Sequence, residues 1–209
     1  MTPPQLSAEE LELLHELINI AFGRAVADLQ HLIDIFVVLR PPEADLFDAH
    51  RVRALLEEHI ARFGDTAFIE QPFYGDFRGK GLLVLPGGAG RDLISILDPE
   101  YDGTAPSKVL EEETLLEVGN ILIGACIGQL SELLDTHSTY APPRVIHLTP
   151  EEGIREEDLF TNGSFSLVLR TSFEFEHRNV EGFLLLISES TTFTWLREAL
   201  ALALERLFG

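Results

Sequence analysis

A carboxylate and an amide recur at the same spacing in two distant parts of the chain. Glu16 lies three residues before Asn19, and Glu117 lies three residues before Asn120. A carboxylate accepts hydrogen bonds and attracts cations, whereas a neutral amide both donates and accepts. Such groups can hold and orient another molecule. The stretch "EEETLLEVGNILIG", residues 111–124, otherwise has the composition of a core helix, so the amide in its middle requires an explanation.

Helical geometry places these polar residues on one strip. At about 100° per residue, Glu113, Glu117 and Asn120 fall within about 60° of one another, and Gly124 follows one turn later on the same side. The opposite side carries the apolar residues Leu115, Leu122, Cys126 and Leu133. We therefore expect an exposed polar strip in which the glycine lets another surface approach closely.

The chain contains an internal repeat with an offset of 101 residues. The offset superposes Glu12 on Glu113, Glu16 on Glu117, Asn19 on Asn120, Gly23 on Gly124 and Pro41 on Pro142. The residues of the first copy make up site one, and those of the second copy make up site two. The same offset places "GLLVL" over "GFLLL". The sequence therefore predicts a single domain, 1–209, made of two repeats at 8–100 and 109–208.

A proline strengthens the repeated pattern. In both copies it lies 22 residues after the asparagine, as Pro41 and Pro142. Glu and Asn alone are common on a solvated helix face, but the Glu, Asn and Pro triplet arises by chance in roughly 2% of chains this long. Two triplets in equivalent places are far less frequent. Glu176 and Asn179 have the short spacing without the proline, so we set this third pair aside.

Each copy combines a long amphipathic helix with strands. Long helices are expected at 8–33 and 108–136, the first with Ser7 as its cap. Segments rich in β-branched and aromatic residues predict strands at 34–39, 66–77, 81–86, 144–149, 165–176 and 180–188. Further helices are expected at 48–64, 90–97 and 191–208. Tight connections between successive strands predict antiparallel neighbours within each half.

Charge and composition limit the classes of partner. The chain has a formal net charge of -20 and 45% hydrophobic residues, so it can bury a core but would repel nucleic acid and anionic membranes. No apolar run approaches the length of a membrane span, and the first residues lack the features of a signal peptide. We therefore expect a cytoplasmic protein with no nucleic-acid partner and no membrane insertion. The seven histidines are scattered, which predicts no metal site.

The spacing of these residues resembles the site motif of the CheC/CheX/FliY family of bacterial chemotaxis phosphatases. That motif has Asp or Ser, then Glu four residues on, Asn three residues later, and Pro after 21 intervening residues. Both copies match at Glu, Asn and Pro, and both depart from the motif at its first position, where Glu12 and Glu113 stand. Two motifs with no obvious appended domain most resemble the CheC branch of the family.

The resemblance implies an α+β fold in which two pseudo-symmetric halves share a six-stranded antiparallel sheet, flanked by the two long motif-bearing helices. It implies a phosphatase acting on a phosphorylated CheY-like response regulator. Asn19 and Asn120 would orient the attacking water, and Glu16 and Glu117 would anchor the regulator. No cofactor of its own is expected, because the regulator would hold the magnesium ion. The residues Glu12, Glu113, Gly23, Gly124, Pro41 and Pro142 would bind the substrate or shape the site.

An alternative function uses the same residues without catalysis. In that hypothesis the chain is a binding module that holds a response regulator or a CheD-like partner. Retention of Glu and Asn in both copies favours the phosphatase. Under either hypothesis a CheD-like deamidase is a second candidate partner.

The two predicted sites differ beside the amide. Gly119 precedes Asn120, whereas Ile18 precedes Asn19 and the bulky Phe22 follows three residues after it. We expect these larger side chains to crowd site one. On that basis Asn120→Ala should lower phosphatase activity more than Asn19→Ala.

Overall fold

The computed structural model describes residues 6–33, 37–98, 100–101, 104–152, 154, 165–175 and 180–208, with side chains described only to residue 27 in the first helix and to residue 205 in the last. The predicted strand start at 34–36 lies outside the described residues, as do residues 176–179 of the predicted tight connection "EHRNVEG". The elements are α1 (Ala8–Ile33), β1 (Val37–Leu39), β2 (Glu43–Phe47), α2 (Ala49–Phe63), β3 (Thr66–Gly75), β4 (Gly79–Pro86), α3 (Ala89–Leu97), α4 (Lys108–Leu133), β5 (Ser138–Tyr140), β6 (Arg144–Leu148), β7 (Ser166–Phe175), β8 (Val180–Ser188) and α6 (Thr192–Phe208).

The two long helices begin at serine caps. Ser7 accepts a hydrogen bond from the Glu10 amide at 3.1 Å, and the Glu10 carboxylate accepts one from the Ser7 amide at 2.6 Å, which makes a capping box. α1 has the predicted limits, 8–33. α4 ends at Leu133 and not at the predicted residue 136, because Asp135 has a left-handed backbone conformation with φ of 55° that no α-helix accommodates.

All strand pairs are antiparallel, as predicted, and the sheet is six positions wide. Its order is β1-β7-β8-β4-β3-β5, with β2 also on β7 and β6 also on β3. Among the described residues the expected six-stranded sheet therefore contains eight strands, because each edge position is divided into two short strands. β1 is separated from β2 near Pro41, and β5 from β6 near Pro142. A proline has no amide hydrogen for the ladder, so it interrupts an edge strand.

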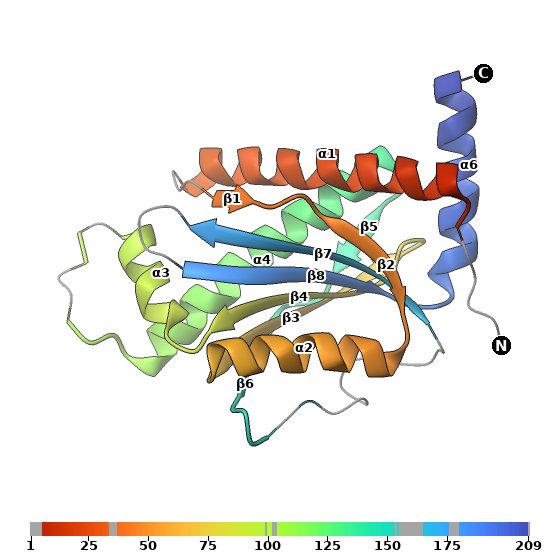
Figure 1. Ribbon diagram of the computed structural model, residues 1–209. Helices are drawn as coiled ribbons and strands as arrows, with labels where there is room; N and C mark the ends of the chain where they lie inside the picture. Colours follow the sequence, from red (N-terminus) through yellow and green to blue (C-terminus); the bar gives the residue numbers. More distant parts are fainter. Residues whose placement is uncertain are drawn as a thin grey trace.

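The sheet is covered on both faces (Figure 1). On one face α1 and α4 pack against each other and against the larger core, which includes Ile69 and Leu83. On the other face α2 covers a smaller core, which includes Phe68 and Val84. Successive strand residues thus point to opposite cores, so apolar residues occur at successive positions of the central strands, as in "GLLVL" of β4.

The two edges of the sheet carry matching ion pairs with exchanged signs. Glu43 of β2 is opposite Arg170 of β7 and pairs with it, and Arg144 of β6 is opposite Glu70 of β3, with 3.2 Å between Nη2 and Oε2. The pairing relates the edge strands by 101 residues but the inner strands β3 and β7 by 100. The single uninterrupted offset seen in the sequence therefore does not hold in the central strands, and the repeat limits 8–100 and 109–208 remain a prediction.

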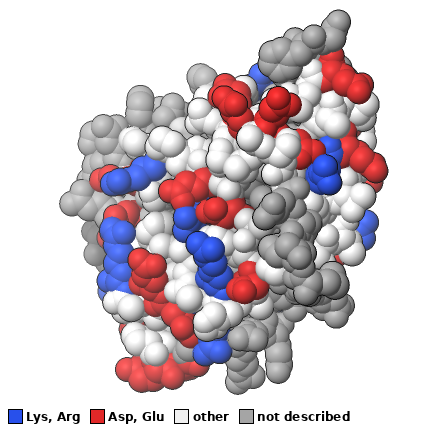
Figure 2. Space-filling model, turned by 45° about the vertical axis from the view of Figure 1, so that its right-hand side comes forward, with Lys and Arg blue, Asp and Glu red and all other residues white. Residues whose placement is uncertain are grey.

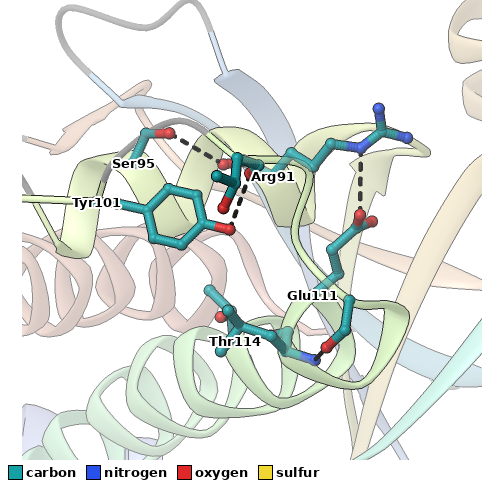
Figure 3. Close-up of polar contacts among 8 residues, drawn as sticks. Arg91, Ser95, Tyr101, Glu111 and Thr114 are labelled. Atoms are coloured by element: carbon teal, nitrogen blue, oxygen red, sulfur yellow. Dashed lines mark hydrogen bonds and ion pairs between the residues drawn. The ribbon is translucent and has the colours of Figure 1, made fainter.

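Several polar contacts lie around the connection between α3 and α4 (Figure 3). Arg91 of α3 pairs with Glu111 of α4, with 3.2 Å between Nε and Oε1. The Tyr101 hydroxyl donates to the Thr104 carbonyl at 2.9 Å, and Ser107 caps α4. The two halves are adjacent, as expected from the shortness of this connection, and they are joined by the pairing of β4 with β8 and by the packing of α1 on α4.

α4 is long and apolar enough to cross a membrane by length and composition alone. However, 56% of its most apolar window is buried inside the fold. Burial of this kind is what the core helix of a folded domain requires, so the apolar content of α4 is accounted for by packing.

His59 makes folding stability depend on pH. It lies in α2 and stacks on Phe183 of β8, with ring centroids 3.6 Å apart. Burial lowers the pKa of His59 from 6.5 to about 4, against the opposing effect of Glu58. The unfolded chain therefore binds this proton more readily, and the stabilisation is complete above about pH 6.5 and is lost as the pH falls toward 4. Because of His59, we expect the free energy of unfolding to fall by about 1 to 2 kcal/mol when the pH is lowered from 7 to 5.

His59→Phe is the matched variant, because it keeps an aromatic ring on Phe183 and removes the titrating group. Denaturant unfolding at several pH values should show a flatter profile for the variant across this range. Identical profiles for the two proteins would contradict the assignment.

Candidate functional site

The predicted polar strips are exposed on both long helices. Glu12, Glu16 and Asn19 are exposed on α1, and Glu113, Glu117 and Asn120 are exposed on α4. The opposite sides of the helices are buried, as Leu115, Leu122 and Cys126 show for α4. Burial also raises the pKa of the Cys126 thiol, which keeps it protonated and unreactive. The sequence thus predicted correctly which face of each helix is available to a partner.

Site one lies in a groove of about 1290 Å³. The groove brings together Glu12, Glu16, Asn19 and Pro41, which are separated by up to 29 residues in the sequence. Its remaining described lining is Ala8, Glu9, Leu11, Leu13, His15, Pro42, Leu204 and Glu205. The last two belong to α6, a wall that the sequence did not predict. Gly23 lies outside this lining.

The groove is acidic. Lysine and arginine do not occur among its described lining residues, whereas four of those residues are glutamates. Figure 2 shows acidic side chains gathered at the level of α1 and of the free end of α6, with mixed charges lower on the same face. Across the described residues, Glu16 and Glu117 make no ion pair within the chain. Both carboxylates are therefore available to a cationic group of a partner.

Site two has a different construction, because a strand residue holds its amide. Gln71 of β3 is only 1% exposed, and its Nε2 donates to Asn120 Oδ1 at 2.7 Å and to the Ala141 carbonyl at 3.2 Å. Ala141 precedes Pro142, and its own amide donates to the Pro72 carbonyl at 3.0 Å. One side chain thus links the Asn of site two to the backbone beside its Pro. Gln71 was not among the predicted site residues, and its only signal in the sequence is a polar residue, next to Glu70, in a strand with apolar residues on either side.

Site one has the corresponding tether but lacks the link to its amide. Thr171 of β7 donates to the Arg40 carbonyl at 2.7 Å, and the Arg40 amide donates to the Ser172 carbonyl at 2.9 Å. Arg40 precedes Pro41, so Thr171 stands where Gln71 stands at site two. For Asn19 the described part of the chain offers no side-chain hydrogen bond.

The predicted crowding of site one is wrong. Ile18 is 0% exposed and Phe22 is 1% exposed, so both point into the core and away from the polar strip. Gly119 is also buried, and a Cβ built on it would lie 2.4 Å from Ile69 Cγ2. Gly119 therefore allows α4 to pack closely on β3, and it does not open site two.

Gly23 and Gly124 are open, as expected. A Cβ built on either residue would meet no atom within 4 Å. Tyr140 of β5 lies beside the second of them, with its hydroxyl 3.5 Å from the Gly124 carbonyl, and burial raises the pKa of that hydroxyl. Packing within the fold therefore does not require glycine at these two positions. Their small size leaves room for an approaching surface.

The comparisons with known proteins concern the fold. No family model matches the sequence. The solved structure of FliY from Thermotoga maritima aligns with 96% of this chain and 100% of its own, at 19% identity and a TM-score of 0.68. The middle domain of FliM from Vibrio alginolyticus aligns with 88% of this chain and 98% of its own, at 14% identity and a TM-score of 0.56. A CheX protein from Desulfovibrio desulfuricans aligns with 81% of this chain and 98% of its own, at 13% identity and a TM-score of 0.52.

The chain therefore has the α+β fold of the CheC/CheX/FliY family of chemotaxis proteins. This confirms, at the level of the fold, the resemblance indicated by the Glu, Asn and Pro spacing. The roles of the individual site residues remain predictions.

The two kinds of glycine should respond differently to alanine. Gly119→Ala should lower the free energy of unfolding by about 1 to 3 kcal/mol, because the new methyl group would overlap Ile69. Gly124→Ala should leave it unchanged or raise it by up to about 1 kcal/mol, because alanine favours the helix and meets open space. Denaturant unfolding of both variants measures the difference. Equal destabilisation would refute the packing role of Gly119.

Proposed function

We propose that the chain is an aspartyl-phosphate phosphatase that accelerates dephosphorylation of a CheY-like response regulator. The observation that carries the proposal is the exposed Glu and Asn pair on each of two helices, with the backbone before a proline tethered close to each helix by a strand side chain. Both copies keep this arrangement. The fold shared with FliY and CheX supports the same conclusion.

The chemistry requires little from this chain. An aspartyl phosphate is hydrolysed by in-line attack of water, and the regulator would supply the magnesium ion that neutralises the phosphoryl oxygens. This chain then needs only to place the attacking water in line with the phosphoryl group and to keep it in that orientation. A neutral amide is suited to this task because it accepts from the water and donates to a neighbouring oxygen. Asn19 and Asn120 would each have this role.

The glutamates would hold the regulator. Glu16 and Glu117 are exposed, lie one turn before the amides and have no ion-pair partner of their own among the described residues. A lysine beside the regulator's phosphorylation site would supply that partner. The net charge of -20 adds long-range attraction for a basic surface. Such a reaction belongs in the cytoplasm, where we place the protein.

A binding module without catalysis is the second candidate. It is favoured by one observation, which is that the FliM middle domain shares the fold, so the fold alone does not imply phosphatase activity. The two candidates differ in one measurement. Addition of the chain to a CheY-like regulator, phosphorylated by a small-molecule donor with Mg²⁺, should accelerate release of inorganic phosphate. Binding without faster release would favour the module.

Single substitutions at site two should separate rate from affinity. In an Asn19→Ala background, Asn120→Ala should raise the activation free energy of phosphate release at saturating regulator by about 2 to 4 kcal/mol. Binding of the regulator should be retained. Glu117→Ala should instead weaken binding, because it removes the carboxylate that pairs with the regulator. Phosphate release and regulator binding are measured separately, the latter by titration calorimetry. Should Asn120→Ala abolish binding, or leave the saturated rate intact, its role in placing water is wrong.

A further inference from the structure

The bridge between Gln71 and Asn120 fixes which way the Asn120 amide faces. The oxygen and nitrogen of a side-chain amide are normally assigned from their partners. The Ala141 carbonyl can only accept, so the Gln71 group that lies 3.2 Å from it must be the NH₂ group. The same NH₂ group lies 2.7 Å from Asn120, which must therefore present its Oδ1. The NH₂ group of Asn120 is left facing away from Gln71.

This geometry arises from the alternation of β3. Residues at positions 67, 69, 71 and 73 point to the face of the sheet that α1 and α4 cover. Ala67, Ile69 and Phe73 fill the core there, whereas Gln71 reaches the boundary where α4 meets the loop after β5. A buried side chain with two fixed partners loses most of its freedom, and it imposes that restriction on Asn120.

The fold does not require a glutamine at this position. Thr171, at the matching position of β7, tethers the equivalent carbonyl with a shorter side chain. Among the described residues Gln71 Oε1 is buried without a hydrogen-bond partner, which is unfavourable for stability. A threonine would avoid that cost and keep the tether, so what glutamine adds is its contact with Asn120.

We propose that Gln71 is a positioning residue that presets the Asn120 amide for its partner. It turns the NH₂ group of Asn120 outward and leaves one lone pair of Oδ1 for a second hydrogen bond. This inference rests on the proposed function, in which that lone pair accepts from the attacking water and the NH₂ group donates to a phosphoryl oxygen. Among the described residues Asn19 of site one has no such bridge, so we expect its amide to become ordered when the regulator binds.

The decisive variant is Gln71→Thr, which copies the residue found at site one. It keeps a hydroxyl for the Ala141 carbonyl, as Thr171 has for Arg40, and it cannot span the distance to Asn120. In an Asn19→Ala background, Gln71→Thr should lower the saturated rate of phosphate release by roughly tenfold, with half-saturation by the regulator changed less than about twofold. Thermal unfolding should show a folded protein.

A double-substitution cycle separates positioning from a structural role. In an Asn19→Ala, Asn120→Ala background, Gln71→Thr should have no further effect on the rate, because its effect passes through Asn120. An equal loss in the presence and absence of Asn120 would overturn the proposal. An unchanged saturated rate in the Gln71→Thr variant would also overturn it.

A second readout does not depend on catalysis. In ¹⁵N-labelled protein without regulator, the side-chain amide of Asn120 should have an order parameter of roughly 0.8, falling below about 0.6 in Gln71→Thr. The Asn19 amide serves as the internal reference and should be mobile in both proteins. If no protein accelerates phosphate release but these order parameters differ as stated, the proposed function fails and the positioning contact stands. If Asn120 is equally mobile with and without Gln71, the positioning role fails whatever the rates.

Discussion

Burial of the apolar stripes of α1 and α4 against one face of the sheet determines where the Glu, Asn and Gly residues of both sites lie. Each helix contributes buried side chains such as Leu14 and Leu122 to the large core, and α4 approaches β3 so closely at Gly119 that a methyl group there would overlap Ile69. Because a helix repeats every 3.6 residues, fixing the apolar stripe also fixes the polar strip on the other side. The Glu and Asn residues are therefore held in place by packing that they do not take part in, and they can be exposed without being mobile as a group.

The prolines complete this arrangement through the edges of the sheet. By interrupting each edge strand, they produce a short irregular segment whose carbonyl is free to bond with a side chain of the next strand. Thr171 makes that bond at site one and Gln71 at site two. The spacing between Asn and Pro thus covers three successive parts of the chain. These are the end of the helix after the Asn, the connection to the sheet, and the first short edge strand. A constant spacing in the two copies reflects a constant architecture and not a direct contact between Asn and Pro.

Local periodicity predicted the exposed strips, the long helices, the antiparallel pairing and the open glycines, because each of these depends on residues close in the sequence. It failed where position is set by distant contacts. Ile18 and Phe22 seemed to crowd the amide when only their neighbours in sequence were considered, yet their side chains belong to the core. The two extra edge strands are short, and β2 contains two acidic residues, so strand propensity gave no signal. Gln71 is 49 residues from Asn120, and no local pattern reports which strand residue will face which helix residue.

The two sites show how equal folds can support unequal environments. The backbone tethers match in both copies, so the geometry of helix and proline is kept wherever the fold is kept. Beyond that, site one has an acidic groove with α6 as a second wall, and within the described part of the chain Asn19 has no side-chain hydrogen bond. At site two Asn120 accepts a hydrogen bond from Gln71. A groove suits contact with a large part of a partner, whereas an amide restrained as we propose for Asn120 suits a geometrically demanding step at small entropic cost. Differences of this kind can arise at the margin of the core. Leu204 and Glu205 of α6 are not fully buried, and Gln71, although buried, reaches the boundary between α4 and the loop after β5.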